Sequence, residues 1–336
     1  MKDVNTIRRK VENIKGLPTL PGIVKKISEM VVKPTTSAED IGRVISSDQV
    51  LSAKVLKLIN SAFYGFPGRI SSVTHGIVLL GFNVVKGLVL SASVFDMMEG
   101  KMVGLWEHSL GTAITSGIIG KRIKQENPEE GNEAGLLHDI GKVVIKVSMP
   151  DEYEKISKLV VEKEMSMFKA EKAVLGMTHA EIGGFLAEKW NLPQNLRDPI
   201  TYHHSPHRAR IAPKQTAMIH LADILIKGIG HGQGGDMWIP PLDKEAWQIL
   251  KLSKKDIEEI IIEMMTVEKS PVSTKGEETE PLEVLVEELE ERFKMVTSDP
   301  VLMEIKEIFK KQLVLKEEER QASLETSVSE TFQDKK

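Results

Sequence analysis

Seven side chains of the kinds that bind transition metals are spread along this sequence, and four of them form two adjacent pairs. His138 and Asp139 lie in the apolar stretch of residues 135–142, where an imidazole and a carboxylate are costly to bury unless both find partners. A metal ion is one such partner, because it accepts nitrogen and oxygen ligands together. A hydrogen bond to a neighbour or to a backbone carbonyl would also satisfy the imidazole. The dipeptide alone therefore favours an ordinary core histidine.

Five further residues of ligand type change this interpretation. They lie on or beside separate apolar segments and are, in chain order, His108, His179, His203, His204 and Asp223. Their spacing exceeds that of any local zinc motif, so only a bundle of helices could bring them together. Side chains that project inward from several helices are a known way to build a metal site in an all-α core. Because the chain has no cysteine, imidazole and carboxylate ligation suits iron, manganese, nickel or zinc.

The elements that must position these residues are predicted to be helices. Apolar residues recur at helical spacing nearly everywhere, and almost no alternation typical of strands is present. The predicted helices include residues 3–15, 37–45, 48–62, 72–80, 83–98, 105–125, one helix containing His138 and Asp139, surface helices beginning at Pro150 and at Met165, and residues 180–190, 194–202 and a helix beginning at Pro213. The sequence therefore predicts an all-α, multi-helix bundle.

The chain divides into four predicted parts. Residues 1–100 form an N-terminal helical layer without obvious chemistry, and residues 101–232 form the metal-binding core. Residues 233–266 contain two closing helices. Residues 267–336 begin with a charged linker and continue with two amphipathic segments, and the sequence from about Glu317 onward has the composition of a disordered tail. The apolar stripes of this tail need a partner surface, since short isolated helices are marginal in water.

The composition excludes several classes of function. A net charge of −4 gives no electrostatic reason to expect nucleic acid or an anionic membrane as a partner. The absence of cysteine excludes disulfides, thiolate metal sites and cysteine nucleophiles. The polar N-terminus has no signal-peptide pattern, and no apolar run reaches membrane-spanning length. We therefore expect a cytoplasmic protein.

The ligand-type residues and their surroundings resemble a known family. The order His, His-Asp, His, His-His, Asp is similar to the HD superfamily of metal-dependent phosphohydrolases in its two-metal version, and the flanking segments resemble the HDOD family of bacterial signalling proteins. These segments are Leu17-Pro18-Thr19-Leu20-Pro21, residues 48–65 with Asn60-Ser61, residues 70–81, residues 175–183 and Trp190-Asn191-Leu192-Pro193. The resemblance extends over residues 10–230 and leaves the tail after Met265 uncovered.

The resemblance implies a specific distribution of ligands. One metal would be held by His108, His138, Asp139 and Asp223, and a second by His179, His203 and His204, with Asp139 as the bridge. A bridging carboxylate suits two ions about 3.5–4 Å apart. In related phosphodiesterases a lysine at the position of Lys142 contacts the scissile phosphate. The alternative for this residue is a solvated surface lysine.

Two departures from related enzymes argue against hydrolysis of cyclic di-GMP. Phosphodiesterases with a Gly-Tyr-Pro signature carry it soon after the paired histidines, where this chain has Ser205-Pro206-His207-Arg208-Ala209-Arg210. The glutamate that binds a third metal in some of those enzymes would fall at Gly104. Glu107 is out of register and is expected to be solvated.

Two further histidines are expected to have structural roles. His75 lies on an apolar helix and is predicted to be a core or interface residue. His220 shares a helix face with Asp223, and the predicted role of its ring is a hydrogen bond to a backbone carbonyl. Neither residue is included among the expected ligands.

Two classes of function fit these observations. The first is a regulatory HDOD protein that keeps a binuclear metal site and acts through a signalling protein partner or through self-association by its C-terminal tail. The second is an active phosphohydrolase that acts on a nucleotide or another phosphoester, with Lys142 as a catalytic residue. Family behaviour favours the regulatory protein, whereas the complete ligand set and Lys142 favour the enzyme.

Overall fold

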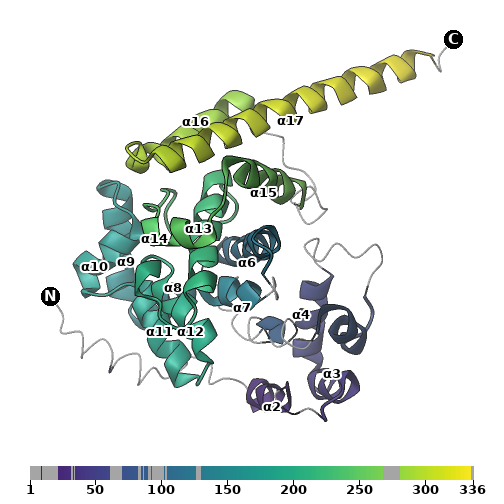
Figure 1. The fold of residues 1–336 in the computed structure, drawn as a ribbon, viewed down its shortest axis with the longest axis vertical. Coiled ribbons are helices and arrows are strands. Elements are labelled where there is room, and N and C mark those ends of the chain that lie inside the picture. Colours follow the sequence, from purple (N-terminus) through teal and green to yellow (C-terminus); the bar gives the residue numbers. More distant parts are fainter. Residues whose placement is uncertain are drawn as a thin grey trace.

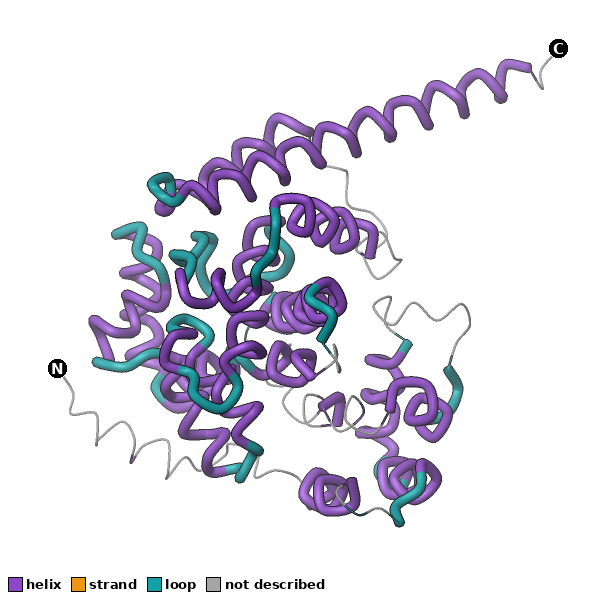
Figure 2. Tube along the Cα trace, viewed as in Figure 1, coloured by secondary structure: helices purple, strands orange, loops and turns teal. Residues whose placement is uncertain are grey.

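The computed structural model describes residues 22–60 apart from 32 and 34, residues 70–81, 104–125, 130–267 and 281–333, and a few single residues outside these ranges. Within this part of the chain every regular element is a helix, so the predicted all-α fold is confirmed (Figure 1, Figure 2). The described portion contains no helix with the length and apolar character needed to cross a bilayer. The predicted helix at residues 3–15 and most of that at 83–98 lie outside the described residues.

The N-terminal helices form a layer beside the rest of the bundle (Figure 1). They are α2 (Gly22–Val31), α3 (Ala38–Ser46), α4 (Gln49–Ile59) and the helical residues 73–81. Ser37 begins α3 with a capping box, because its hydroxyl accepts the Asp40 N–H while the Asp40 carboxylate accepts the Ser37 N–H. The buried residues Ile41 and Val55 belong to a hydrophobic cluster that also contains Leu137 and Ile182 of the central helices. The layer and the centre therefore share one core.

The central helices are those that carry the predicted ligands. They are α6 (Leu105–Arg122), α7 (Glu130–Leu137), α8 (Ile140–Ser148), α11 (His179–Lys189), α12 (Gln194–Tyr202) and α13 (Pro213–Ile229), with α9 (Pro150–Glu162) and α10 (Met167–Leu175) packed beside them. Glycine permits their close approach at two points. A Cβ on Gly135 would lie 2.5 Å from the Cα of Ala113, and one on Gly141 would lie 1.9 Å from the carbonyl oxygen of His179.

The segment containing His138 and Asp139 is not the single helix that the sequence predicted. α7 ends at Leu137 and α8 begins at Ile140, so the two residues form the junction between them. His138 turns back to donate its Nδ1–H to the carbonyl of Gly135 at 2.7 Å, which uses an acceptor that a continuing helix would need for its own backbone. Asp139 takes the N-cap position of α8, although its side chain does not cap the helix. Both side chains are thereby free to point into the bundle.

A second hydrophobic cluster joins the C-terminal helices to α6 and α13. Its helices are α14 (Lys244–Leu250), α15 (Lys254–Val267), α16 (Leu282–Phe293) and α17 (Pro300–Gln333), and the short η3 (Lys294–Val296) connects α16 to α17. We call residues 282–333 the C-terminal hairpin. Its residues Leu289, Phe293 and Phe309 are buried, and the Phe309 ring would lie 2.6 Å from a Cβ placed on Gly228 of α13. The apolar stripes predicted in the tail thus pack on the body of the protein (Figure 1).

The end of the tail differs from the prediction of disorder after about Glu317. α17 continues as one helix to Gln333 and extends beyond α16 (Figure 1). Part of the reason lies in side-chain pairs at helical spacing, because Glu317 accepts hydrogen bonds from both Arg320 and Gln321. Such pairs stabilise a helix without burial, and composition alone does not reveal them.

Because the hairpin packs on α13, we expect alanine substitutions at two positions of α17 to differ strongly in their effect on the stability of the protein. Replacing Phe309 with alanine should lower the free energy of unfolding by about 3–5 kcal/mol, because it leaves a cavity against α13. Leu315→Ala is the matched control, since Leu315 is 40% exposed on the same helix. Urea unfolding of both variants measures the difference, and equal stabilities would contradict the packing described here.

Candidate metal centre

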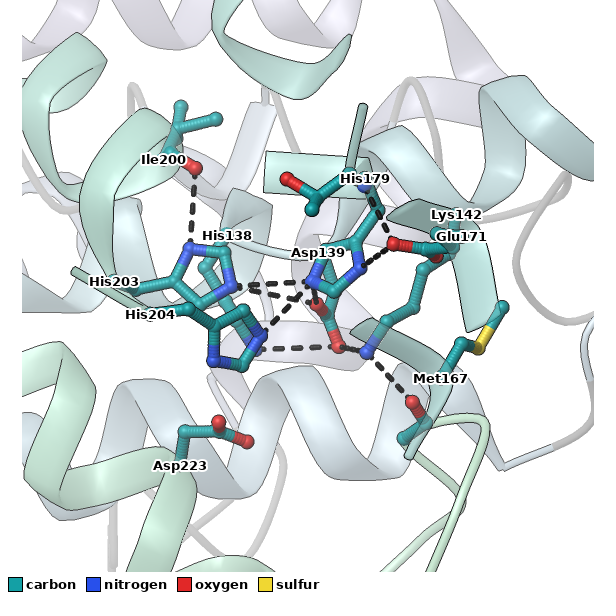
Figure 3. Close-up of polar contacts among 12 residues, drawn as sticks. His138, Asp139, Lys142, Met167, Glu171, His179, Ile200, His203, His204 and Asp223 are labelled. Carbon is teal, nitrogen blue, oxygen red and sulfur yellow. Dashed lines mark hydrogen bonds and ion pairs between the residues drawn. The ribbon is translucent and has the colours of Figure 1, made fainter. Parts of the chain in front are cut away.

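The structure brings all seven predicted ligand residues into one cluster at the centre of the bundle. His108 comes from the first turn of α6, His138 and Asp139 from the α7–α8 junction, His179 from the first position of α11, His203 and His204 from the turn that follows α12, and Asp223 from α13. Figure 3 labels six of them, Asp139 and five others around it. Residues separated by more than a hundred positions in the sequence therefore meet only because the helices pack.

Asp139 lies between two groups of imidazoles. Its Oδ2 is 3.4 Å from Nε2 of His108 and 3.3 Å from Nε2 of His138. Its Oδ1 is 3.2 Å from Nε2 of His179 and 3.8 Å from Nε2 of His203. The two oxygens of one carboxylate thus face different sets of nitrogen atoms, which is the arrangement of a bridging ligand.

The remaining ligand atoms complete one group on each side of Asp139. Asp223 Oδ1 lies 3.2 Å from Nε2 of His108, and these two residues with His138 offer three ligand atoms within 4.8 Å of one another. On the other side, Nε2 of His179 lies 3.3 Å from that of His203 and 3.1 Å from that of His204. These three imidazoles form the second group.

Hydrogen bonds on the outer side of the rings fix which nitrogen faces the centre. The Nδ1–H groups of His138 and His203 donate to the carbonyl oxygens of Gly135 and Ile200, and that of His179 lies 2.7 Å from a carboxylate oxygen of Glu171 (Figure 3). In a neutral imidazole the other nitrogen, Nε2, then carries a lone pair. Several lone pairs point at one another across about 3 Å, an arrangement that repels unless a cation or a shared proton lies between them.

Buried polar atoms without partners show that these residues fit a metal ion. They are Nε2 of His108, Nε2 of His138, Oδ1 of Asp139 and Oδ1 of Asp223. Leaving such groups unpaired in a protein interior costs about 1–3 kcal/mol each, and more for charged groups. Imidazole nitrogen and carboxylate oxygen are suitable ligands for a divalent transition metal, so one kind of ion would satisfy every unpaired atom of the set.

The electrostatics at four of the ligands favour the protonation states that bind metals. Burial lowers the pKa of His203 and His204 well below the usual value for histidine, and it also lowers the pKa of His108. Burial opposes ionisation of Asp139, but nearby His138 and Lys142 hold its pKa well below the usual range. Three of the rings are therefore neutral at pH 7 and the bridging carboxylate is charged.

Two further ligands are controlled by charged neighbours. Burial opposes the charge on Asp223, yet Lys227 and His108 hold its pKa well below the usual range. Burial also opposes a charge on His179, but the Glu171 carboxylate raises the pKa of this imidazole above its usual value. The Glu171 contact therefore increases the basicity of the His179 ring, as expected of a carboxylate behind a metal ligand.

Lys142 does not lie at the surface. Its side chain is 2% exposed, and its Nζ donates to Asp139 Oδ2 at 2.5 Å and to the carbonyl of Gly234 at 2.6 Å (Figure 3). The interpretation of Lys142 as a solvated lysine is therefore wrong. Lys142 lies in the first turn of α8 and pairs with Asp139 three residues before it, at a spacing that places both side chains on one face.

Glu171 is a site residue that the sequence reasoning missed. The helix that carries it, α10, was predicted to be an amphipathic surface helix, yet Glu171 is fully buried. Its Oε2 accepts the backbone N–H of His179 at 2.7 Å and contacts Nδ1 of the same residue at 2.7 Å. A sequence signal did exist, because Glu171 lies between Met167 and Leu175 on the apolar stripe of the helix, four residues from each.

A glycine-rich loop, residues 230–241, covers the site from the side of α13. Lys227, one turn after Asp223, lies 3.3 Å from Oδ1 of Asp236 in this loop. Asp236 also accepts the N–H groups of Met167 and Trp238, so it ties the loop to α10 and α13. Burial opposes the charge on Lys227, but Asp236 and Asp223 raise the pKa of this ammonium above its usual value.

The residues that were not expected to bind metal are placed as follows. His220 donates from Nδ1 to the carbonyl of His203 at 2.7 Å, which confirms its predicted role, and its Nε2 accepts the Asp243 N–H at 2.9 Å. Glu107 is exposed, as predicted. His75 is exposed on the helix at residues 73–81, which excludes the core and leaves an interface as its predicted location.

Comparison with known proteins identifies the domain that carries most of this cluster. The family model described as the HDOD domain matches residues 17–206, more than half of the chain. This match includes six of the seven ligand residues and ends before Asp223. An uncharacterised protein of Treponema pallidum is 27% identical over 201 residues, which make up 58% of this chain and 39% of that protein. The matched part thus spans about two fifths of that relative.

Solved structures show the same fold. An HDOD domain protein of unknown function from Geobacter sulfurreducens is 26% identical, with a TM-score of 0.66 over 80% of this chain and 99% of that one. A candidate signal-transduction protein from Marinobacter aquaeolei is 22% identical, with a TM-score of 0.64 over 78% of this chain and 62% of that one. A candidate phosphohydrolase from Shewanella amazonensis is 23% identical, with a TM-score of 0.54 over 89% and 96% of the two chains.

The contacts of Glu171 predict that it tunes the centre without binding metal itself. Glu171→Gln should weaken metal binding about 10- to 100-fold while leaving the helical content unchanged, because an amide supports the His179 ring less strongly than a carboxylate. Competition with a chelator measures the affinity. Glu154→Gln on α9 is the control, since Glu154 is exposed. Equal affinities of the two variants would contradict this role.

Proposed function

This chain belongs to the HDOD family, and on that basis we propose that it is a signal-transduction protein whose HD-like core holds a binuclear metal site. The proposed ligands are the seven residues of the cluster: His108, His138, Asp139 and Asp223 for one ion, and His179, His203 and His204 with Asp139 for the other. Cytoplasmic localisation, expected from the sequence, remains part of this proposal.

The position of Asp139 is the observation that carries the proposal. Its two oxygens face different imidazole groups at 3.2–3.4 Å. Two ions about 3.5–4 Å apart would use such a shared carboxylate. The mixed nitrogen and oxygen ligands suit iron, manganese, nickel or zinc.

Bound metal ions would supply positive charge and Lewis acidity at this position. The protein's own groups prepare the site for that charge. Glu171 orients His179, Lys142 is held against Asp139, and His220 fixes the backbone at His203. Because each of these contacts fixes a ligand before any ion is bound, the ligands need little rearrangement when an ion binds.

A regulatory role is supported by the family and by the parts of the chain that carry no ligands. The N-terminal layer and the C-terminal hairpin both pack on the metal core through buried apolar side chains. A change at the centre could therefore reach either surface through contiguous packing. We propose a signalling protein partner, or self-association through the tail, as the recipient of that change.

Phosphoester hydrolysis is the second candidate function. It is favoured by the complete ligand set and by Lys142, whose ammonium lies beside the bridging carboxylate where it could contact a bound phosphate. Against it, Lys142 is already engaged by Asp139 and by the Gly234 carbonyl. We therefore favour the regulatory function and leave hydrolysis to direct measurement.

The proposed function predicts the metal content of the protein. Purified protein expressed in metal-supplemented medium should retain close to two divalent transition-metal ions per chain, and Asp139→Ala should lose both because the bridge is shared. Glu107→Ala, a change at an exposed carboxylate one residue from His108, should keep them. Elemental analysis that finds no metal in the wild-type chain, or both ions in Asp139→Ala, would overturn the binuclear site.

Another prediction distinguishes a regulatory protein from a phosphohydrolase. Metal-loaded protein should hydrolyse no common nucleotide, cyclic dinucleotide or aryl phosphate faster than about 1 per second, the lower end of enzymatic turnover. Lys142→Met should lower the melting temperature, because it leaves the carbonyl of Gly234 and one side of Asp139 without a donor. If the protein instead hydrolyses one of these compounds faster than this in a metal-dependent reaction, and Lys142→Met loses that activity while it keeps its metal, then the protein is a phosphohydrolase.

A further inference from the structure

A groove with a volume of about 460 Å³ lies outside the metal centre, where four helices meet. Its lining comes from the C-terminal ends of α6 and α14 and from the N-terminal turns of α13 and α15. Asp256, the carboxylate in this lining, caps α15 by accepting the N–H of Ser253 at 2.9 Å. None of the seven proposed metal ligands lines the groove, and its apolar residues are Ile123, Ile249, Leu250 and Leu252.

The groove carries positive charge that the protein itself does not neutralise. Lys124, Lys214 and Lys251 line it, and none of their ammonium groups forms a salt bridge within the part of the chain that the structure describes. Arg122 also lines the groove, but it is already paired with Glu259. Charged groups that meet across an interface are arranged with opposite signs. The three lysines therefore favour a partner that supplies carboxylates.

The local backbone disfavours a lysine at each of these three positions. Lys124 and Lys251 follow the ends of α6 and α14 in the left-handed conformation, with φ angles of 52° and 51°, where glycine is the favoured residue. Lys214 lies in the first turn of α13, where the helix dipole disfavours a cation. Residues that break local preferences are typical of functional sites. Three such lysines in one groove therefore indicate a binding surface.

The distal part of α17 has the complementary charge. We call residues 317–333 the distal tail; it extends beyond α16 and away from the body of the protein (Figure 1). A short helix that lacks a packing surface is marginal in water, so the distal tail gains from a partner. Against Arg320 as its basic residue, its acidic residues are Glu317, Glu318, Glu319, Glu325 and Glu330.

The distal tail points away from the groove of its own chain. α17 runs alongside α15, because Glu304 pairs with Lys254 at 2.7 Å near the start of α15 and Lys316 donates to the carbonyl of Met265 at 3.0 Å near its end. The groove lies at the first turn of α15, beside Asp256. The distal tail thus leaves the body at the opposite end of α15.

A second copy of the chain removes this mismatch. The distal tail is about 25 Å long and α15 is about 20 Å long. In a two-fold pair of antiparallel copies, each distal tail would run along α15 of the other copy and end near its groove. Such a pair is closed, because each copy offers the same two surfaces to the other.

We propose that the groove binds the acidic distal tail of a second copy of this chain, in a two-fold dimer in which the tails are exchanged. Lys124, Lys214 and Lys251 then pair with carboxylates of the partner's tail. The inference rests on the proposed function in one respect, since it selects self-association rather than a separate protein as the route of signalling. It does not require that the centre binds metal.

Sedimentation equilibrium of the full-length protein tests the proposal. The wild-type chain should be a dimer at about 0.1 M salt and should dissociate at about 1 M salt, because salt screens exposed charges. Lys124→Gly/Lys251→Gly should raise the dissociation constant of the dimer at least about tenfold. The matched control is Lys155→Gln/Lys163→Gln, which removes the same charge from exposed positions in and beside α9 and should leave the dimer intact.

The same glycine variant separates binding from folding. At about 1 M salt, where the wild-type chain is monomeric, its melting temperature should equal or exceed that of the wild type, because glycine relieves the left-handed backbone. An exchange of charges adds a second check. Lys124→Glu/Lys251→Glu and Glu325→Lys/Glu330→Lys should each abolish the dimer, and all four changes in one chain should restore it.

Three results would overturn the inference. They are a wild-type chain that stays monomeric at low salt, a dimer that the groove variants leave unchanged, and a chain with all four charge changes that stays monomeric. The first result would assign the groove to an acidic partner of another sequence. Elemental analysis of the same samples tests the proposed function separately, because a chain that forms this dimer without metal would overturn only the binuclear site.

Discussion

The structure depends on one carboxylate that is surrounded by imidazoles in the interior of a helical bundle. Asp139 is fully buried, and both of its oxygens face nitrogen atoms that are fixed by hydrogen bonds behind them. Such a group is unfavourable in an apolar core unless positive charge compensates it. Lys142 supplies part of that charge, and a metal ion between the rings would supply the rest.

Close helix packing makes this arrangement sterically feasible. Gly141 lets the start of α8 approach the carbonyl of His179, and Gly135 lets α7 approach α6 near Ala113. A methyl group at either position would displace one helix from the next. The glycines that flank the His-Asp pair therefore determine the distances between ligands on different helices, whereas the ligands determine only the chemistry.

Some features of this site could be predicted from residue types and others could not. The seven ligands were identifiable because histidine and aspartate are rare within apolar helices, and the helical period indicated an all-α fold. The break between α7 and α8 was missed because it depends on the His138 bond to Gly135. The burial of Lys142, and the helix that continues past Glu317, depend on tertiary or side-chain contacts that the period does not report. The burial of Glu171 was signalled by its place on the apolar stripe of α10 but was overlooked.

Anomalous diffraction from crystals of the metal-loaded protein tests the central claim most directly. Two peaks are expected about 3.5–4 Å apart. One should lie beside Oδ2 of Asp139, near His108, His138 and Asp223. The other should lie beside Oδ1 of Asp139, near His179, His203 and His204. A single peak would contradict the bridging role of Asp139. A map with no peak within bonding distance of Asp139 would contradict the metal centre itself.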